Sequence, residues 1–204
     1  QTEGMPLDSL SSNKWKIKKE KAKLKALDHA AELLDIESRR SVASSCQLIC
    51  DKNSYNEFDN DFPYVLTKDQ INCINDVIKD ISLIKPMNRV ICGDVGFGKT
   101  EIAMRGAFVA VHAKKQVMLL APSTILAKQH LESFVKRFFN FPVNIELLTR
   151  HTSQKNKLKI YEDFKHKKID ILIGTHTLLN SEIALDNLGL LVIDEEHRFG
   201  TKQK

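Results

Sequence analysis

Gly93-Asp94-Val95-Gly96-Phe97-Gly98-Lys99-Thr100 fits the pattern GxxxxGKT, and this stretch decides the fold that we predict for the chain. In this pattern the glycines let backbone N–H groups approach and cradle phosphates. The lysine neutralises charge on the β- and γ-phosphates, and the hydroxyl of the last residue binds Mg²⁺. We therefore predict a nucleotide-binding loop over all eight residues, with Lys99 also catalytic and Thr100 also a metal ligand.

A second motif, Asp194-Glu195-Glu196-His197, follows an apolar run at residues 190–193. Asp194 is predicted to hold Mg²⁺ from a second strand, and Glu195 to orient an attacking water molecule against the γ-phosphate. Glycine-rich turns and acidic strand ends are each common, so the prediction depends on the pair. Together the two motifs indicate catalytic residues that use ATP and Mg²⁺ as cofactors, as in an ATP-driven motor.

The residues around the loop predict an α/β fold. The short apolar run 89–92 leads into the loop, and residues 101–113 are good helix formers without proline. Further apolar runs, separated by helix-length polar segments, lie at residues 116–121, 143–148, 169–173 and 190–193. This alternation predicts a parallel sheet covered by helices on both faces. Ligands should then bind at the carboxyl ends of the strands, where both motifs fall.

The chain divides into four predicted segments. Residues 1–13 are expected to be a flexible lead-in, residues 14–40 one long basic helix, residues 41–61 a linker, and residues 62–204 the nucleotide-binding lobe. The helix is predicted from apolar residues at helical spacing without glycine or proline. Its lysines crowd the N-terminal half and its acidic residues the C-terminal half, which opposes the helix dipole. We therefore expect this helix to pack against the lobe or a partner.

The lobe is expected to open with a second amphipathic helix. Thr67 and Gln70 fit a capping box. Four residues should share the buried face of this helix: Ile71, Ile74, Ile78 and Ile81. Gln70 has two possible roles, because it could cap the helix or, with the aromatic Phe62 eight residues upstream, recognise an adenine ring. The two roles are compatible.

Composition narrows the class of protein. The net charge of +5 is concentrated in two clusters: residues 14–25 hold seven lysines and one glutamate, and residues 150–170 hold seven basic and three acidic residues. Either cluster could be a partner surface or a solvated helix face. No run of eighteen apolar residues and no leader peptide occurs, so we expect a cytoplasmic protein without membrane association. The four cysteines lack zinc-site spacing and should be reduced thiols.

Four stretches carry a family resemblance. They are PMNRVICGDVGFGKTEIAMR (86–105), KQVMLLAPSTILAKQH (115–130), IDILIGTHTLL (169–179) and LGLLVIDEEHRFG (188–200). The chain resembles the bacterial transcription-repair coupling factors, which are superfamily 2 DNA translocases. The resemblance implies a RecA-like P-loop NTPase lobe, preceded by the long helix and truncated after the acidic motif. Phe97 and the run 86–89 favour this family over the branched-DNA helicases.

The resemblance also implies roles for individual residues. It assigns Phe62 and Gln70 to the adenine site and makes His197 a coupling residue between the ATP and DNA sites. It implies contacts to duplex DNA from residues at three predicted strand ends: Ser123, Thr124, Arg150, Thr175 and His176. Short hydroxyls and backbone N–H groups at a helix start can hold phosphates without reading bases. Ser123 or Thr124 could instead be a plain N-cap.

The function implied by the resemblance is ATP-dependent translocation on double-stranded DNA in transcription-coupled repair. Such a protein displaces stalled RNA polymerase and aids recruitment of an excision-repair damage-recognition protein, both through modules outside this chain. We expect the lobe alone to hydrolyse ATP poorly, because a second lobe must supply an arginine. Two alternatives stay open: a branched-DNA helicase that remodels forks, and a nucleotide-binding scaffold whose lysine-rich helix docks a partner.

Overall fold

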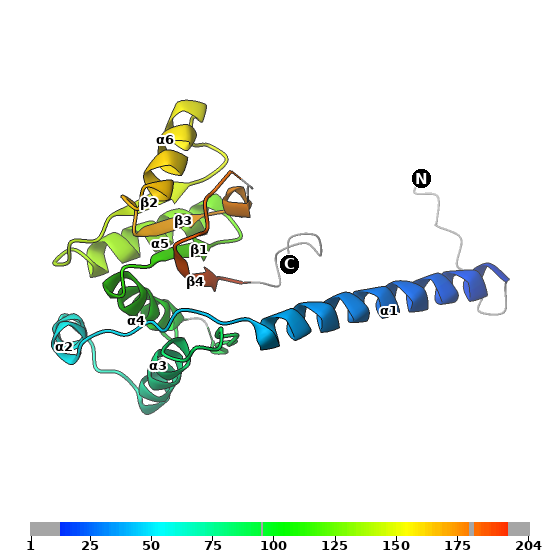
Figure 1. Ribbon diagram of the computed structural model, residues 1–204, viewed down its shortest axis with the longest axis horizontal. Helices are drawn as coiled ribbons and strands as arrows, with labels where there is room; N and C mark the ends of the chain where they lie inside the picture. Colours follow the sequence, from blue (N-terminus) through cyan, green and yellow to red (C-terminus); the bar gives the residue numbers. More distant parts are fainter. Residues whose placement is uncertain (1–12, 95, 180–181, 196–204) are drawn as a thin grey trace, which may run out of the picture. The chain divides into compact units, whose positions relative to one another are not determined.

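The computed structural model describes residues 13–94, 96–179 and 182–195 (Figure 1). The chain divides into two compact units, Gln1–Ser44 and Ser45–Lys204. The helices are α1 (Asn13–Val42), α2 (Lys52–Asn60), α3 (Lys68–Ile81), α4 (Lys99–His112), α5 (Thr124–Arg137), α6 (Gln154–Lys165) and the short 3-10 helix η1 (His176–Leu179). The strands are β1 (Gln116–Leu120), β2 (Ile145–Leu148), β3 (Ile171–Gly174) and β4 (Leu188–Ile193). Within the described residues, no helix has the length and apolar character that a membrane crossing requires.

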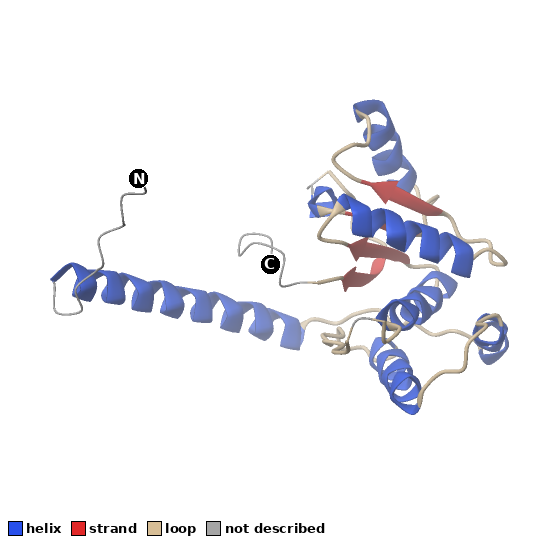
Figure 2. Cartoon of the chain, turned by 180° about the vertical axis from the view of Figure 1, so that it is seen from behind, coloured by secondary structure: helices blue, strands red, loops and turns tan. Residues whose placement is uncertain are grey.

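The second unit is built around a parallel sheet with strand order β2-β3-β1-β4. Figure 2 shows these strands between helices. Side chains alternate across a strand, so each face of the sheet receives every second residue. Val117 and Leu119 of β1 join one core with α3, α4 and α5, whereas Met118 and Leu120 join another with α6. The predicted α/β architecture, a parallel sheet with helices on both faces, is therefore confirmed.

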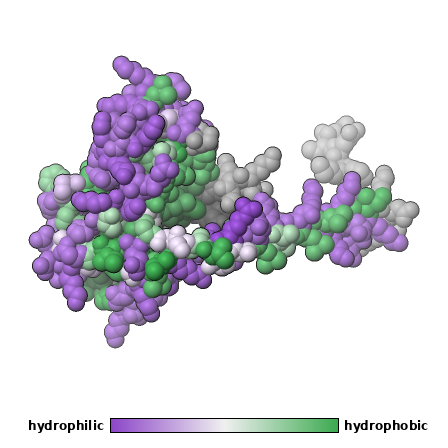
Figure 3. Space-filling model, viewed as in Figure 1, coloured by the Kyte–Doolittle hydropathy of each residue, from purple (hydrophilic) through white to green (hydrophobic). Residues whose placement is uncertain are grey.

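Helix α6 shows how one helix serves both core and surface. Ile160 and Phe164, four residues apart, lie on one side of the helix and are buried. The remaining surface over α6 is mostly hydrophilic (Figure 3), because the basic residues of the 150–170 cluster point to solvent. Ser153 caps the helix, since its hydroxyl accepts a hydrogen bond from the Asn156 N–H.

The first unit consists of the long predicted helix, which is confirmed as α1. Its C-terminal half carries internal ion pairs, with Arg39 2.8 Å from Asp35 and Arg40 3.5 Å from Glu37. These exposed pairs add little stability each. Leu24 and Leu34 of the predicted apolar stripe remain exposed, so the expectation that the helix packs against the lobe or a partner stays a prediction.

The structure differs from the predicted linker at residues 41–61, because residues 52–60 form helix α2. Asp51 caps this helix by accepting a hydrogen bond from the Ser54 N–H at 2.9 Å. Phe58 is fully buried and stacks on Phe108 of α4 with ring centroids 4.2 Å apart. The segment is so rich in Ser, Asn and Asp that composition predicted a loop. One aromatic side chain nevertheless anchors it to the core.

The run before the nucleotide-binding loop also differs from prediction. Residues 89–92 were expected to form a strand, but they have no strand structure. Arg89 donates hydrogen bonds to Asp80 at 2.7 Å and to Asp76 at 3.2 Å, both on α3. Val90 is 78% exposed. The ion pairs hold the start of this run against α3 rather than at the edge of the sheet.

A capping box begins α3, as predicted, with Thr67 and Gln70 exchanging both hydrogen bonds. The buried face is only partly as expected, because Ile74, Val77 and Ile81 are buried whereas Ile71 is exposed. Val77 lies three residues from Ile74 and four from Ile81, so it shares their face. Ile71 lies in the first turn, where the helix extends past the core.

Truncating Phe58 to alanine should destabilise the second unit by about 3 to 5 kcal/mol, because it leaves a cavity where α2 meets α4. The free energy of unfolding, measured by chemical denaturation, tests this. Phe139→Ala is the matched control: Phe139 is 83% exposed, and its loss should change stability by less than about 0.5 kcal/mol. Equal effects of the two variants would contradict the anchoring role of α2.

Glu101 of α4 is a buried carboxylate between two buried arginines, Arg105 and Arg137. Glu101→Gln should destabilise the fold by about 3 kcal/mol, because it removes the charge that compensates two buried cations. This value is at the lower end of the range usual for breaking a buried ion pair, because Asp59 still pairs with Arg105 and Asp61 still pairs with Arg137. Thermal and denaturant unfolding measure the effect, with exposed Glu132→Gln as the control. If the Glu101→Gln protein is as stable as that control, Asp59 and Asp61 alone compensate the charges of the two arginines.

Candidate functional site

The predicted nucleotide-binding loop leads directly into helix α4, whose N-cap is Gly98. Gly96 and Gly98 have φ angles of 85° and 72°, a region that residues with a Cβ rarely adopt. A Cβ on Gly98 would also lie 2.7 Å from the Gln70 amide nitrogen. The positive φ angle is the reason that this position favours glycine, since the Gln70 amide is the end of a flexible side chain and could move. The amides that begin α4 form the type of helix N-terminus that binds phosphate.

Lys99 folds back onto the loop. Its ammonium donates hydrogen bonds to the carbonyl oxygens of Gly93 at 2.5 Å and Asp94 at 2.8 Å. The charge is thereby held inside the turn that the sequence predicts to surround phosphates. Thr100 follows in the first turn of α4 and is partly buried.

Both polar atoms of the Gln70 side-chain amide form hydrogen bonds. Its oxygen accepts from the Thr67 N–H at 2.8 Å, which completes the capping box, and its nitrogen donates to the Phe97 carbonyl at 2.9 Å. The capping role is therefore present, and the same side chain supports the loop. The ring centroid of Phe62 lies 5.6 Å and 5.4 Å from the guanidinium carbons of Arg105 and Arg137. Adenine recognition by Phe62 and Gln70 remains a prediction.

Asp194 and Glu195 directly follow β4. The Asp194 N–H donates to the Leu120 carbonyl at 2.9 Å, which extends the sheet bonding to the motif. Glu195 adopts a φ of 50°, which is strained for a residue with a side chain. The chain therefore bends at the end of the strand, in a conformation that the surrounding structure must hold against this cost.

The carboxylate of Asp194 is held in its charged form. A hydrogen bond from His130 is the largest cause that lowers the pKa of Asp194, and the positive charge of Lys99 lowers this pKa further. Helix α4 begins at the glycine-rich loop and packs against β4, which ends just before Asp194, so the two motifs, about a hundred residues apart, lie on adjoining elements. An ionised carboxylate and a threonine hydroxyl such as that of Thr100 are the hard oxygen ligands that suit Mg²⁺.

His130 was not predicted as a site residue. Its Nε2 lies 2.7 Å from Asp194 Oδ2. A signal for it exists in the sequence, because His130 lies three residues after buried Ala127 and four before buried Phe134. It is therefore a titratable side chain on the core-facing side of an amphipathic helix.

A polar hollow of about 260 Å³ lies at the carboxyl edge of the sheet. It brings together all of the residues to which the resemblance assigns DNA contacts: Ser123, Thr124, Arg150, Thr175 and His176. Ser123 also caps α5, since its hydroxyl accepts from the Leu126 N–H at 3.2 Å. Thr175 is almost fully buried. The more accessible groups of the hollow are therefore those of Thr124, Arg150 and His176.

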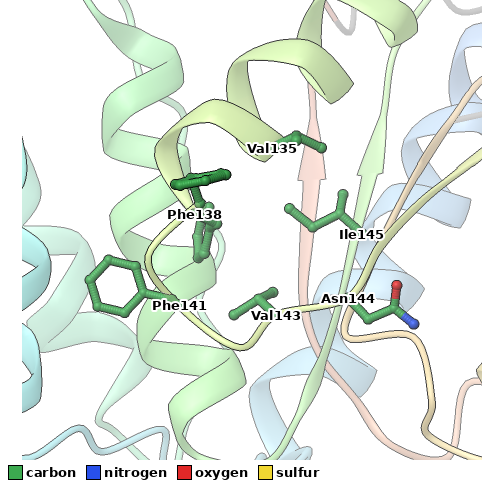
Figure 4. A pocket seen from close by; sticks show the side chains of 7 residues that line it. Val135, Phe138, Phe141, Val143, Asn144 and Ile145 are labelled. Carbon is green, nitrogen blue, oxygen red and sulfur yellow. The ribbon is translucent and has the colours of Figure 1, made fainter.

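A second hollow, of about 300 Å³, lies at the other end of α5 (Figure 4). Its lining is apolar apart from one amide: Val135, Phe138, Phe139, Phe141, Val143, Asn144 and Ile145. No lining side chain can exchange a proton near neutral pH. This hollow is therefore no candidate for the catalytic site. Val95 and His197, which the sequence assigns to nucleotide binding and to coupling, lie outside the described residues.

Comparison with known proteins identifies relatives along the whole chain. Residues 67–204 match the family described as DEAD/DEAH box helicase. The chain is 48% identical to the transcription-repair-coupling factor of Haemophilus influenzae and 46% identical to that of Escherichia coli. Each match covers 99% of this chain and 18% of the relative, so the chain spans about a fifth of these proteins. The resemblance inferred from the sequence motifs is confirmed.

A solved structure of RecG bound to a three-way DNA junction is similar in fold, with a TM-score of 0.75 and 34% sequence identity. The match covers 81% of this chain and 23% of that chain. The predicted RecA-like architecture is confirmed by this likeness together with the family match.

Proposed function

The chain belongs to the DEAD/DEAH box helicase family, and from that premise we propose that it is the ATP-binding lobe of a double-stranded DNA translocase. One observation carries this proposal: helix α4, which begins at the glycine-rich loop, packs against β4, and Asp194 directly follows β4. A loop that binds phosphate and an acidic strand end that binds Mg²⁺ must adjoin for ATP hydrolysis. The proximity of these two groups supports that use of the site.

In the proposed reaction, each residue has a separate task. Lys99 holds the β- and γ-phosphates, and Thr100 and Asp194 hold Mg²⁺, which would neutralise charge that develops on the phosphate oxygens. Glu195 orients the attacking water and accepts its proton. Gln70 supports the loop through the Phe97 carbonyl, and with Phe62 we propose that it contacts the base.

DNA would bind at the polar hollow of Ser123, Thr124, Arg150, Thr175 and His176. Hydroxyls and a guanidinium at a helix start suit phosphate oxygens, which carry no sequence information. A translocase requires contacts of this kind, because it must move along any sequence. His197 would link this site to the ATP site.

The biological role that we propose is transcription-coupled repair, in which the motor displaces stalled RNA polymerase and aids recruitment of an excision-repair protein. The identities of 48% and 46% to two transcription-repair-coupling factors, over 99% of the chain, support this role. Remodelling of branched DNA is the second candidate, favoured by the structural likeness to RecG on a DNA junction. Displacement of a halted polymerase and regression of a model fork are separate assays that distinguish the two.

Lys99→Ala and Glu195→Gln should each abolish ATP turnover in the intact protein that carries this chain. Lys99→Ala removes the charge that binds the phosphates, so nucleotide affinity should fall as well. Glu195→Gln removes only the base, so it should bind ATP within about threefold of wild type while turnover falls by about 10² to 10⁴. Turnover assays and calorimetric nucleotide titrations measure both quantities. Turnover retained by either variant would refute the assignment.

Arg150→Ala should weaken binding of duplex DNA about equally for all sequences and reduce the slope of log affinity against log salt by about 1. Thr124→Val should also weaken binding, but with little change in slope, because threonine carries no charge. Fluorescence anisotropy at several salt concentrations gives both numbers. Lys79→Ala, an exposed charge on α3, is the matched control. If it lowers the slope as much as Arg150→Ala, DNA does not bind preferentially at the hollow.

A further inference from the structure

Helix α5 connects two sites. Its first turn contributes Thr124 to the polar hollow, with Ser123 as its N-cap. Six residues later, about 9 Å along the axis, His130 reaches Asp194, with 2.7 Å between Nε2 and Oδ2. One rigid element therefore carries groups of the proposed DNA site and a direct partner of the proposed metal ligand.

The contact between His130 and Asp194 joins α5 to the residue that follows β4. Helix α5 packs against β2 and β3, whereas Asp194 follows β4 at the opposite edge. The other hollow residues belong to the same half as α5, because Arg150 lies just after β2 and Thr175 just after β3. The imidazole is thus a side-chain link between the half of the sheet with the hollow and the half with the nucleotide motifs.

The chemistry of the pair fixes its hydrogen-bond direction. An ionised carboxylate can only accept, so the His130 Nε2 must carry the hydrogen and donate it. Partial burial protects the bond, since the two side chains are 13% and 29% exposed. Fully buried Ala127 and Phe134 flank His130 on the same face, so the ring is fixed to α5 and moves when α5 moves.

We propose that His130 is a positioning residue that couples occupancy of the DNA hollow to the orientation of the Asp194 carboxylate, and so to nucleotide affinity. This inference rests on the proposed function of the two sites. Phosphate binding at the start of α5 shifts or stiffens the helix, and the imidazole transmits the change to Asp194. By thermodynamic linkage, nucleotide must then change DNA affinity by the same factor.

The test is a binding cycle on the intact protein that carries this chain. The dissociation constant of a fluorescent ADP analogue with Mg²⁺ is measured with and without a DNA duplex, and that of the duplex with and without nucleotide. Wild type should show a coupling factor of at least about fivefold, equal in both directions. His130→Phe keeps the ring volume without the donor and should reduce the factor to below about twofold. His130→Gln, which keeps an N–H donor, should restore most of it.

Gln129→Ala, an exposed neighbour on the same helix, is the control and should keep the wild-type factor. If His130→Phe unfolds, His130→Ala takes its place, because it removes the donor without adding bulk. A wild-type factor in the variant without the donor overturns the inference. So does a loss of nucleotide affinity without DNA as large as that of Lys99→Ala. The inference is also overturned if, in wild-type protein, DNA does not change the nucleotide affinity and nucleotide does not change the DNA affinity. If wild-type protein binds neither nucleotide nor DNA, the proposed function is overturned instead.

Discussion

The buried carboxylate of Glu101 is the interaction on which the second unit depends. It accepts hydrogen bonds from Arg105 at 2.9 Å and from Arg137 at 3.1 Å. The Arg137 guanidinium also donates to the Phe58 carbonyl and lies 3.7 Å above the Phe58 ring. Three helices are joined in this way: α2, α4 and α5. Because buried charges are tolerated only when paired, the geometry of these helices is fixed relative to one another, and with it the loop at the start of α4 and His130 on α5.

Much of this architecture could be predicted because local signals agreed with the fold. The four strands coincide with apolar runs, and the box of Thr67 and Gln70 marks the start of α3 as expected. Predictions from composition were wrong where a single residue, rather than the average of its segment, determined the structure. Phe58 orders α2 within a segment that is otherwise polar, and the burial that makes this possible depends on Phe108, fifty residues away. Likewise, the pairing of Arg89 with α3 cannot be inferred from the apolar run that follows it.

In the candidate site, too, local patterns predict some residues, whereas others depend on contacts between distant parts of the chain. Spacing alone predicts Lys99, Thr100 and Asp194 as site residues, because phosphate and metal binding require those side chains at a glycine-rich turn and a strand end. The family motifs identified the residues that line the hollow. His130 escaped both approaches, since its role arises only when α5 crosses the sheet and meets the end of β4. Helical spacing places His130 on the core-facing side of α5, but its partner depends on strand order, which no local pattern contains.

The folded-back lysine of the loop has a consequence for ligand entry. The Lys99 ammonium already rests on two carbonyl oxygens, so it has lost part of its water shell before any anion arrives. Hydrogen bonds between two charged groups are stronger than those with one neutral partner, which makes exchange of carbonyl for phosphate oxygens favourable. The Lys99 ammonium is thus preorganised by the backbone of the loop. Under the proposed function, nucleotide binding is a replacement of acceptors around one cation.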